Sequence, residues 1–357
     1  MVLCNLKTEG FRCLTALEFT PGEGLNVIAG DNAQGKTSIL EAILFAATSK
    51  SHRTTREAEL VQYGRPGFRV HASGQRNSRS VTVDATWWQG EKRFKVNGVA
   101  QGKVSDILGK MPVVFFSPED VALVRGSAAV RRKFLDMEIS QLEPAYLRAL
   151  QQYRTALKQR NELLKQNGRE PALLDAWDEQ LIRHGRVLVE RRNAFIKELG
   201  CAAVAAYETI ASQEPFTLRY LPDVSPDQDH ARVLTQYRER DRSQGLTNRG
   251  PHRDDFELTV SGKPARHFAS QGQQRTAALA LKLAELKLVC ERIGEYPVFM
   301  LDDVLSELDA KRSERLFQAI PQTVQCLVTT TAMTAPAAPS GVHCTCFHIR
   351  SGTLAPA

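Results

Sequence analysis

The chain has 357 residues, of which 42% are apolar and 24% charged, so it can form a core, and its length predicts two domains or one domain with an insertion. Lysine plus arginine number 47 against 40 acidic residues, and this modest positive charge permits an anionic partner such as nucleic acid. The charged first residues argue against a signal peptide, and the absence of a long uncharged apolar stretch argues against a membrane span. Seven scattered cysteines favour free thiols, so we expect a cytoplasmic protein with no membrane partner.

Residues 1–130 are predicted to form mixed α/β structure. Apolar runs of strand length are separated there by glycine, proline and asparagine, and they cover 25–29, 81–83, 93–96 and 112–116. Asn97-Gly98 after the third run is typical of a tight turn. Trp87 and Trp88 could stack on bases, but the alternation along their strand favours one core and one surface side chain.

A phosphate-binding loop follows the first of these strands and precedes a predicted helix over 38–45. It fits G-x-x-x-x-G-K-[ST] and reads Gly30, Asp31, Asn32, Ala33, Gln34, Gly35, Lys36 and Thr37. Its glycines let successive N–H groups face one anion, Lys36 supplies a positive charge for the phosphates, and the Thr37 hydroxyl can bind Mg²⁺. The alternative is a chance glycine-rich turn, and the flanking strand and helix argue against it. We therefore expect ATP with Mg²⁺ as the cofactors.

The segment 51–56 is a short basic loop rich in hydroxyls. It could contact phosphate of ATP or DNA, or it could be an ordinary exposed loop. The sequence leaves both interpretations open.

Long helical patterns take over after about residue 130. Apolar residues recur at helical spacing over 146–164 and again over 174–199, and Asn167-Gly168 lies between the two runs. Two amphipathic helices joined by a short turn form an antiparallel helical hairpin. Their slight excess of basic residues is interpreted as a solvated helical face.

The α/β pattern returns at about residue 247. Strands are predicted over 256–260, 297–301, 324–328 and 342–349, with a helix over 273–293 and a loop over 332–341. We therefore expect a head made of 1–130 and 247–357, interrupted by an inserted helical lobe over 131–246. Cysteines and histidines alternate along 343–348, which we interpret as a strand rather than a zinc site.

A second helix start suited to an anion precedes the 273–293 helix. It consists of Ser270, Gln271, Gly272 and Gln273, where the serine is a natural N-cap and the glycine allows close backbone approach. An ordinary capped helix is the better explanation of this segment when it is taken alone. A second phosphate-binding helix start makes sense if it serves the nucleotide of another copy of the chain.

Two carboxylates follow the apolar run 298–301. Asp302 and Asp303 come where that strand ends, and ligands bind at this edge of an open α/β sheet. We expect Asp302 to hold Mg²⁺ and Asp303 to orient or deprotonate the attacking water as the catalytic residue. An acidic turn is the alternative, and the phosphate loop argues against it.

In this order the three elements resemble the ATP-binding-cassette class. Segments 6–12 and 38–43 resemble SMC proteins. Four further segments are similar to the RecF family of SMC-like ATPases, and they are 116–120, 131–136, 159–161 and 250–255. The resemblance implies an ATPase head with a mixed sheet and a helical lobe. It also implies that ATP closes a homodimer in which 30–37 of one copy and 270–273 of the other enclose the triphosphate.

The resemblance further implies roles in DNA replication, recombinational repair and the SOS response. The implied partners are single-stranded and gapped duplex DNA and the mediators RecO and RecR. The chain departs from the wider class because 117–120 lacks a glutamine for the Q-loop and 329–331 lacks a switch histidine. Asp303 stands where many cassettes have glutamate, so we expect slow, DNA-stimulated ATP hydrolysis.

Two other functions remain to be weighed. The ATPase subunit of a membrane transporter shares the phosphate loop and paired acids, but the helical hairpin and the missing Q-loop argue against it. A P-loop kinase or nuclease-linked ATPase is disfavoured because of the Ser270–Gln273 segment.

Overall fold

The computed structural model describes residues 1–166, 171–211, 214–225, 228–306, 308–331 and 343–356. The chain divides into two compact units. The first comprises Met1–Asp120, Ala205–Gln213 and Ala278–Ala357, and the second comprises Val121–Val204 and Glu214–Ala277. Two segments that were expected in the head, 121–130 and 247–277, belong to the second unit with the long helices. The loop expected over 332–341 lies outside the described residues.

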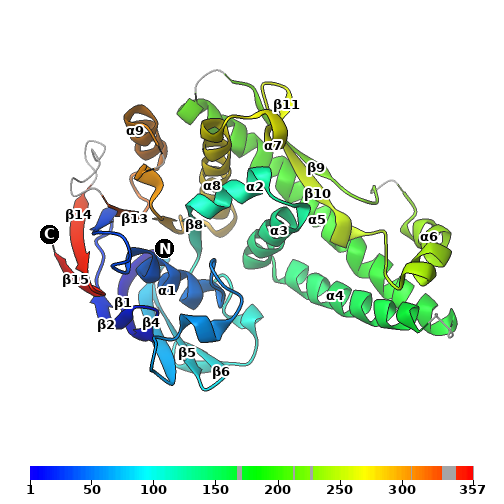
Figure 1. Ribbon diagram of the computed structural model, residues 1–357, viewed down its shortest axis with the longest axis horizontal. Helices are drawn as coiled ribbons and strands as arrows, with labels where there is room; N and C mark the ends of the chain where they lie inside the picture. Colours follow the sequence, from blue (N-terminus) through cyan, green and yellow to red (C-terminus); the bar gives the residue numbers. More distant parts are fainter. Residues whose placement is uncertain (167–170, 212–213, 226–227, 307, 332–342, 357) are drawn as a thin grey trace. The chain divides into compact units, whose positions relative to one another are not determined.

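The first unit contains a six-stranded antiparallel sheet (Figure 1). Its order is β2 (Leu14–Phe19), β1 (Val2–Phe11), β4 (Gly67–Arg76), β5 (Arg79–Trp88), β6 (Glu91–Val96) and β7 (Val99–Gln101). Asn97 and Gly98 both have positive φ between β6 and β7, as a tight hairpin requires. Trp87 stacks on buried Phe68 while Trp88 is exposed, which confirms the predicted alternation.

The second sheet of this unit is parallel except for its last strand. Its order is β15 (Thr353–Pro356), β14 (Cys344–Arg350), β3 (Leu25–Ala29), β13 (Cys326–Thr330), β12 (Val298–Leu301) and β8 (Val113–Phe116). The strand predicted over 324–328 begins two residues later, because the Val324 N–H closes a turn onto the Pro321 carbonyl. β13 lies between β3 and β12, so its carboxyl end separates the phosphate loop from the paired acids.

Helix α1 (Lys36–Thr48) packs against strands of both sheets, and its apolar residues join one buried core with theirs. The unit also contains α9 (Ala310–Ala319) and part of α8 (Gln271–Ile293), which continues from the second unit. Four 3₁₀ turns complete it, and they are η1 (Glu57–Leu60), η2 (Val104–Asp106), η3 (Pro118–Val121) and η5 (Val304–Ser306).

The second unit is mainly helical. Its helices are α2 (Ala122–Arg125), α3 (Ala128–Leu142), α4 (Pro144–Lys165), α5 (Pro171–Ala211), α6 (His230–Gln244) and α7 (Ala265–Phe268), with the 3₁₀ turn η4 (Pro251–Arg253). A three-stranded sheet accompanies them in the order β11 (Lys263–Pro264), β10 (Asp255–Val260) and β9 (Phe216–Leu221).

Helices α4 and α5 form the predicted antiparallel hairpin (Figure 1). Three contacts join them, and these pair Tyr146 with Arg192, Tyr153 with Gly185, and Arg160 with Asp178. Each step is seven residues forward on α4 and seven residues back on α5. This spacing is that of a coiled-coil seam, so the two helices run in opposite directions at one register.

Candidate nucleotide-binding site

The phosphate loop takes a conformation that needs its glycines. Gly35 has φ 111°, and a Cβ there would lie 3.0 Å from the Cys13 sulfur. At Gly30 a Cβ would lie 2.5 Å from the Ile349 carbonyl oxygen. A side chain at either position would collide with the neighbouring strand or turn, so both glycines are required by geometry.

Lys36 lies over the opening of this loop. Its Nζ donates to the carbonyl oxygens of Gly30, at 2.6 Å, and Asp31, at 2.8 Å. Burial lowers the pKa of Lys36, while Asp303, Asp302 and Asp31 act in the opposite direction. Because the two hydrogen-bond acceptors are neutral, the ammonium charge remains available to an anion.

The N-terminus of α1 adds to the same field. Gly35 caps the helix without a side-chain hydrogen bond, so the first N–H groups of α1 are not capped by a side chain. Unpaired N–H groups at a helix start attract anions. The loop is held from behind by Gln34, whose Oε1 accepts from the Ser351 N–H at 2.6 Å and whose carbonyl accepts from the Gly352 N–H at 3.0 Å.

The paired acids lie beside the loop, as the sequence predicts. Asp302 Oδ1 accepts from the Thr37 hydroxyl at 3.0 Å and from the Thr329 hydroxyl at 2.6 Å. Burial raises the pKa of Asp302, Glu119 and Asp303 raise it further, and the two hydroxyl hydrogen bonds act against this. The Thr37–Asp302 contact joins the end of the phosphate loop, which follows β3, to the carboxyl end of β12.

Asp303 has a left-handed backbone, with φ 48°. Its N–H donates to the Thr329 hydroxyl oxygen at 2.9 Å, so Thr329 binds both acids at once. Its own Oδ1 is buried and has no hydrogen-bond partner among the described residues. An unpaired carboxylate oxygen at this place suits a ligand that the protein does not itself supply.

Sequence reasoning missed Thr329 and Glu119. The sequence gives the run of threonines no role beyond its lack of a histidine, and it gives 117–120 a family resemblance but no role for Glu119. Because β8 pairs with β12 in parallel, Phe116 is aligned with Leu301, and the turn after β8 brings exposed Glu119 close enough to raise the pKa of Asp302. The strand pairing that would identify both residues is not visible in local sequence.

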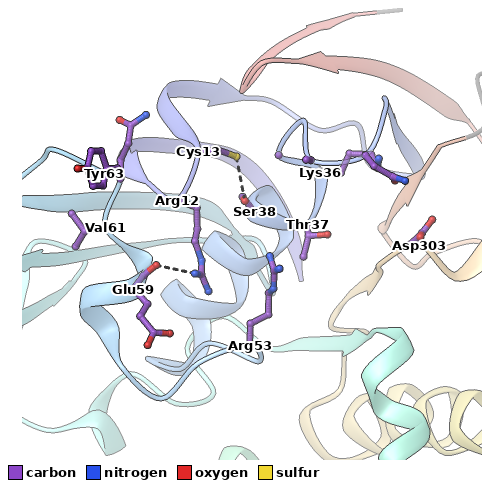
Figure 2. Close-up of a pocket in the computed structure, with 14 residues that line it drawn as sticks. Arg12, Cys13, Lys36, Thr37, Ser38, Arg53, Glu59, Val61, Tyr63 and Asp303 are labelled. Atoms are coloured by element: carbon purple, nitrogen blue, oxygen red, sulfur yellow. Dashed lines mark hydrogen bonds between the residues drawn. The ribbon is translucent and has the colours of Figure 1, made fainter.

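A cavity of about 870 Å³ extends from the phosphate loop (Figure 2). Its lining residues all belong to the first unit, and they are Arg12, Cys13, Asn32, Ala33, Gly35, Lys36, Thr37, Ser38, Arg53, Glu59, Val61, Gln62, Tyr63 and Asp303. Figure 2 shows Lys36, Thr37 and Asp303 toward one end and Val61 and Tyr63 toward the other. The cavity therefore has a polyanion-binding end and an end with an apolar and an aromatic side chain, as a nucleotide requires.

Two arginines, Arg12 and Arg53, lie in the cavity wall, and Arg12 is neutralised by a buried carboxylate. Arg12 binds Glu41 in bidentate fashion at 2.9 and 2.8 Å, and the Ser51 hydroxyl donates to the same carboxylate at 2.5 Å. Burial acts to raise the pKa of Glu41, but the hydrogen bonds from Arg12 and Ser51 outweigh it and the pKa is lowered. The loop that carries Arg53 is thus tied to α1 by Ser51, which favours the phosphate-contact interpretation of 51–56.

The Ser270–Gln273 segment belongs to the second unit. The Gln273 N–H donates to Ser270 Oγ at 3.3 Å, and the Ser270 N–H donates to Gln273 Oε1 at 2.8 Å. This reciprocal pair is a capping box, which confirms the predicted N-cap. Ser270 and Gln271 are exposed, so their polar groups are accessible at the start of α8.

Comparison with known proteins agrees with this site. Residues 2–336 match the family model of the RecF/RecN/SMC N-terminal domain. The DNA replication and repair protein RecF of Shouchella clausii is 40% identical over 346 residues, covering 93% of each chain. The RecF protein of an Exiguobacterium species is 40% identical over 367 residues, covering 99% of each.

Solved structures show the same relationship. The recombination mediator protein RecF with ATP, from the RecFOR pathway, is 32% identical with a TM-score of 0.90, and the match covers 100% of this chain and 97% of that one. An Smc head bound to the winged-helix domain of ScpA is 16% identical with a TM-score of 0.59, which shows the shared fold alone. These matches do not support the transporter subunit weighed above. Among the described helices, none has the length and apolar character to cross a bilayer.

Proposed function

The chain belongs to the RecF/RecN/SMC family, and we propose that it is an ATP-dependent DNA-binding protein of DNA replication and recombinational repair. The observation that carries this proposal is the contact between Thr37 and Asp302. It brings the phosphate loop and the acidic strand end into one site, beside a cavity of nucleotide size. The RecF relative solved with ATP supports ATP as the nucleotide.

Thr37 and Asp302 are the residues that would hold Mg²⁺. A hydroxyl and a carboxylate oxygen are hard oxygen ligands of the kind this ion prefers, and Asp303 Oδ1 has no hydrogen-bond partner among the described residues. When bound, the ion would neutralise charge on the phosphates. Lys36, the Gly30–Thr37 backbone and the α1 N-terminus would bind those phosphates.

Asp303 would orient or deprotonate the attacking water. Its backbone is fixed by Thr329, and its side chain is one methylene shorter than glutamate. We expect hydrolysis to be slow and DNA-stimulated, with ATP acting mainly as a timer. The Thr329 hydroxyl binds both acids where other cassettes have a histidine, so it is the candidate for sensing the γ-phosphate.

ATP would join two copies of the chain. Ser270, Gln271, Gly272 and Gln273 of one copy would contact the triphosphate held by the phosphate loop of the other, because this exposed helix start is suited to an anion. Closure of that dimer would hold single-stranded or gapped duplex DNA. RecO and RecR would be its partners in the cytoplasm, as the RecFOR pathway of the solved relative suggests.

Replacement of Lys36 tests nucleotide binding. Lys36→Ala removes the ammonium aimed at the phosphates, so binding of a fluorescent ATP analogue should be lost. Lys7→Ala is the matched control, because Lys7 pairs with Glu18 on the exposed face of β1. Equal ATP affinity of Lys36→Ala and Lys7→Ala would refute the assignment of the site.

The dimer is tested separately by gel filtration with ATP and Mg²⁺, with and without gapped DNA. Ser270→Arg should keep ATP binding but prevent pairing, through charge and steric conflict at the helix start. Asp303→Asn should bind ATP and accumulate as a dimer, because hydrolysis no longer releases it. A monomeric Asp303→Asn variant at saturating ATP would show that the role given to Asp303 is wrong.

A further inference from the structure

The segment Gly250–Asp255 in the second unit is held in place at nearly every residue. Gly250 has φ 133°, and a Cβ there would lie 2.7 Å from the Tyr153 hydroxyl oxygen. The Pro251 carbonyl accepts from Arg192 Nη1 at 2.7 Å. The start of this segment is therefore fixed against both α4 and α5.

The His252 ring is held through both nitrogens. Nδ1 lies 2.7 Å from the Tyr153 hydroxyl and Nε2 lies 3.0 Å from the Thr247 carbonyl oxygen. Burial lowers the pKa of His252 to about 4, so the ring is neutral near pH 7. It serves as a rigid spacer between α4 and the turn that contains Arg253.

The end of the segment is fixed by one buried and one partly exposed acid. Asp254 is fully buried and accepts from the Tyr220 hydroxyl, from the Asp223 N–H at 2.9 Å and from Arg192 at 2.8 Å. Asp255 receives a bidentate pair from Arg131 at 2.6 and 2.8 Å. Tight anchors thus stand on both sides of residue 253.

Arg253 is the exception in this segment. Its side chain is exposed, and the described structure gives it no hydrogen bond or ion pair. Arg132 also lies near enough to His252 to act on its charge, and its Nη1 donates to the neutral Asp254 carbonyl at 2.7 Å. The carboxylates of Asp255, Asp254 and Asp136 act on Arg132 from nearby, but the described structure shows no direct ion pair with them. Arg253 and Arg132 are thus two guanidinium groups around the rigidly held His252, and the described residues give neither of them a direct ion pair.

We propose that Arg253, assisted by Arg132, is a contact point for the phosphate backbone of DNA. This inference rests on the proposed function, and it names a surface for that function. A guanidinium fork matches a phosphate group, and a support that is already ordered lowers the entropic cost of binding.

A nucleic acid fits this surface better than a protein does. Protein interfaces are anchored by buried aromatic and other apolar side chains. Among the described residues of this unit, the exposed large apolar side chains are Leu173 and Phe268, and neither belongs to the segment. A charged site without an apolar anchor favours backbone phosphates, which are read without regard to base sequence.

The test measures the affinity for a gapped duplex at several salt concentrations. Each phosphate contact contributes about 0.7–0.9 to the slope of log affinity against log salt, so Arg253→Ala should bind more weakly and lower that slope by about 1. Arg253→Lys keeps the charge and should retain most of the slope. ATP affinity should be the same in all three proteins.

Arg240→Ala is the control, because Arg240 is an exposed arginine on α6 and its loss changes the net charge equally. An equal loss of slope in Arg240→Ala would overturn the inference, since any arginine would then serve. If Arg253→Ala keeps the wild-type slope of log DNA affinity against log salt, the inference is also overturned. This holds even if the variant loses binding to a protein partner. If the wild-type chain binds no DNA, the proposed function itself fails, and that result is distinct from the other two.

Discussion

The two units set the register of their elements by different means. In the first unit, backbone ladders align the strands, and the buried core that joins α1 to both sheets is apolar. In the second, the seam between α4 and α5 contains two buried arginines, Arg160 and Arg192. Helices satisfy their backbone groups internally, so side chains must determine how one helix is positioned along another.

The contacts of these arginines show how specific that alignment is. Arg160 is fully buried and binds Asp178 on α5, Asp241 on α6 and the Thr247 hydroxyl. A shift of either helix by one turn would leave these charges buried without partners, which is costly. An apolar seam would tolerate such a shift far better. The buried arginines therefore fix the position of α4 along α5, which an apolar seam would not do.

The largest expected effect follows from breaking that seam. Arg160→Met leaves the Asp241 carboxylate buried without its arginine and leaves Asp178 with Arg238 alone, so the free energy of unfolding should fall by about 3–5 kcal/mol. Urea unfolding measures this. Arg186→Met is the control, because Arg186 pairs with Glu190 on the exposed face of α5. This substitution should lower the free energy of unfolding by about 0.5 kcal/mol or less. A neutral Arg160→Met variant would remove the contrast between the units.

A second prediction concerns pH. His252 has its pKa lowered to about 4 by burial, with Arg253 and Arg132 acting the same way and Asp223 against them. The unfolded chain, with the ordinary value of 6.5, binds the proton first, so stability is full above that value and falls as the pH drops toward 4.

Each unit of pKa difference is worth about 1.4 kcal/mol, which sets the scale of this loss. His252→Gln has no such titration, so its unfolding free energy should depend less on pH across that window than the wild-type value does. Urea unfolding at several pH values measures the difference. Parallel curves for the two proteins would contradict the burial of a neutral ring in the second unit.

A third prediction concerns Asp302, a buried acid at the candidate nucleotide-binding site of the first unit. Because burial raises the pKa of Asp302, the carboxylate is protonated at a higher pH than an ordinary aspartate, and Mg²⁺ requires the ionised form. Mg²⁺-dependent ATP affinity should therefore fall as the pH is lowered through that raised pKa. Asp302→Asn should lose at least about tenfold in Mg²⁺-dependent affinity, roughly 1.4 kcal/mol, and show no such titration. Titration calorimetry at several pH values measures this. The same pH dependence in the wild type and in Asp302→Asn would contradict the assignment.

The smallest effect is expected in the apolar core. Ile43 is fully buried on α1, and Ile43→Val removes one methylene, so the free energy of unfolding should fall by about 0.5–1.5 kcal/mol. Thermal unfolding measures the shift. A loss as large as that of Arg160→Met would mean that the two cores respond alike to substitution.

Much of the fold could be predicted from local patterns. The phosphate loop, the strands beside it and the hairpin follow from spacing, because glycine geometry and helical periodicity act over a few residues. The bonds of Thr329, in contrast, depend on contacts across the sheet. The ionic seam was not predicted for the same reason, since Arg160 and Asp241 are 81 residues apart.

The candidate site shows the same division. Its phosphate-binding residues stand in one continuous motif, whereas Arg12, Glu119 and Thr329 reach it from three different strands or turns. Charged and hydroxyl side chains of this kind are common on surfaces, so their type alone indicates nothing. The parallel alignment of β8, β12 and β13 brings Glu119 and Thr329 to the site, and the turn after β1 brings Arg12.

The bond between Gln34 and Ser351 links residues that are 317 positions apart. During synthesis the phosphate loop leaves the ribosome long before the turn that supports it, and before strands β13 and β14 on either side of β3. A growing chain therefore cannot complete its triphosphate cradle until the residues of that turn have emerged.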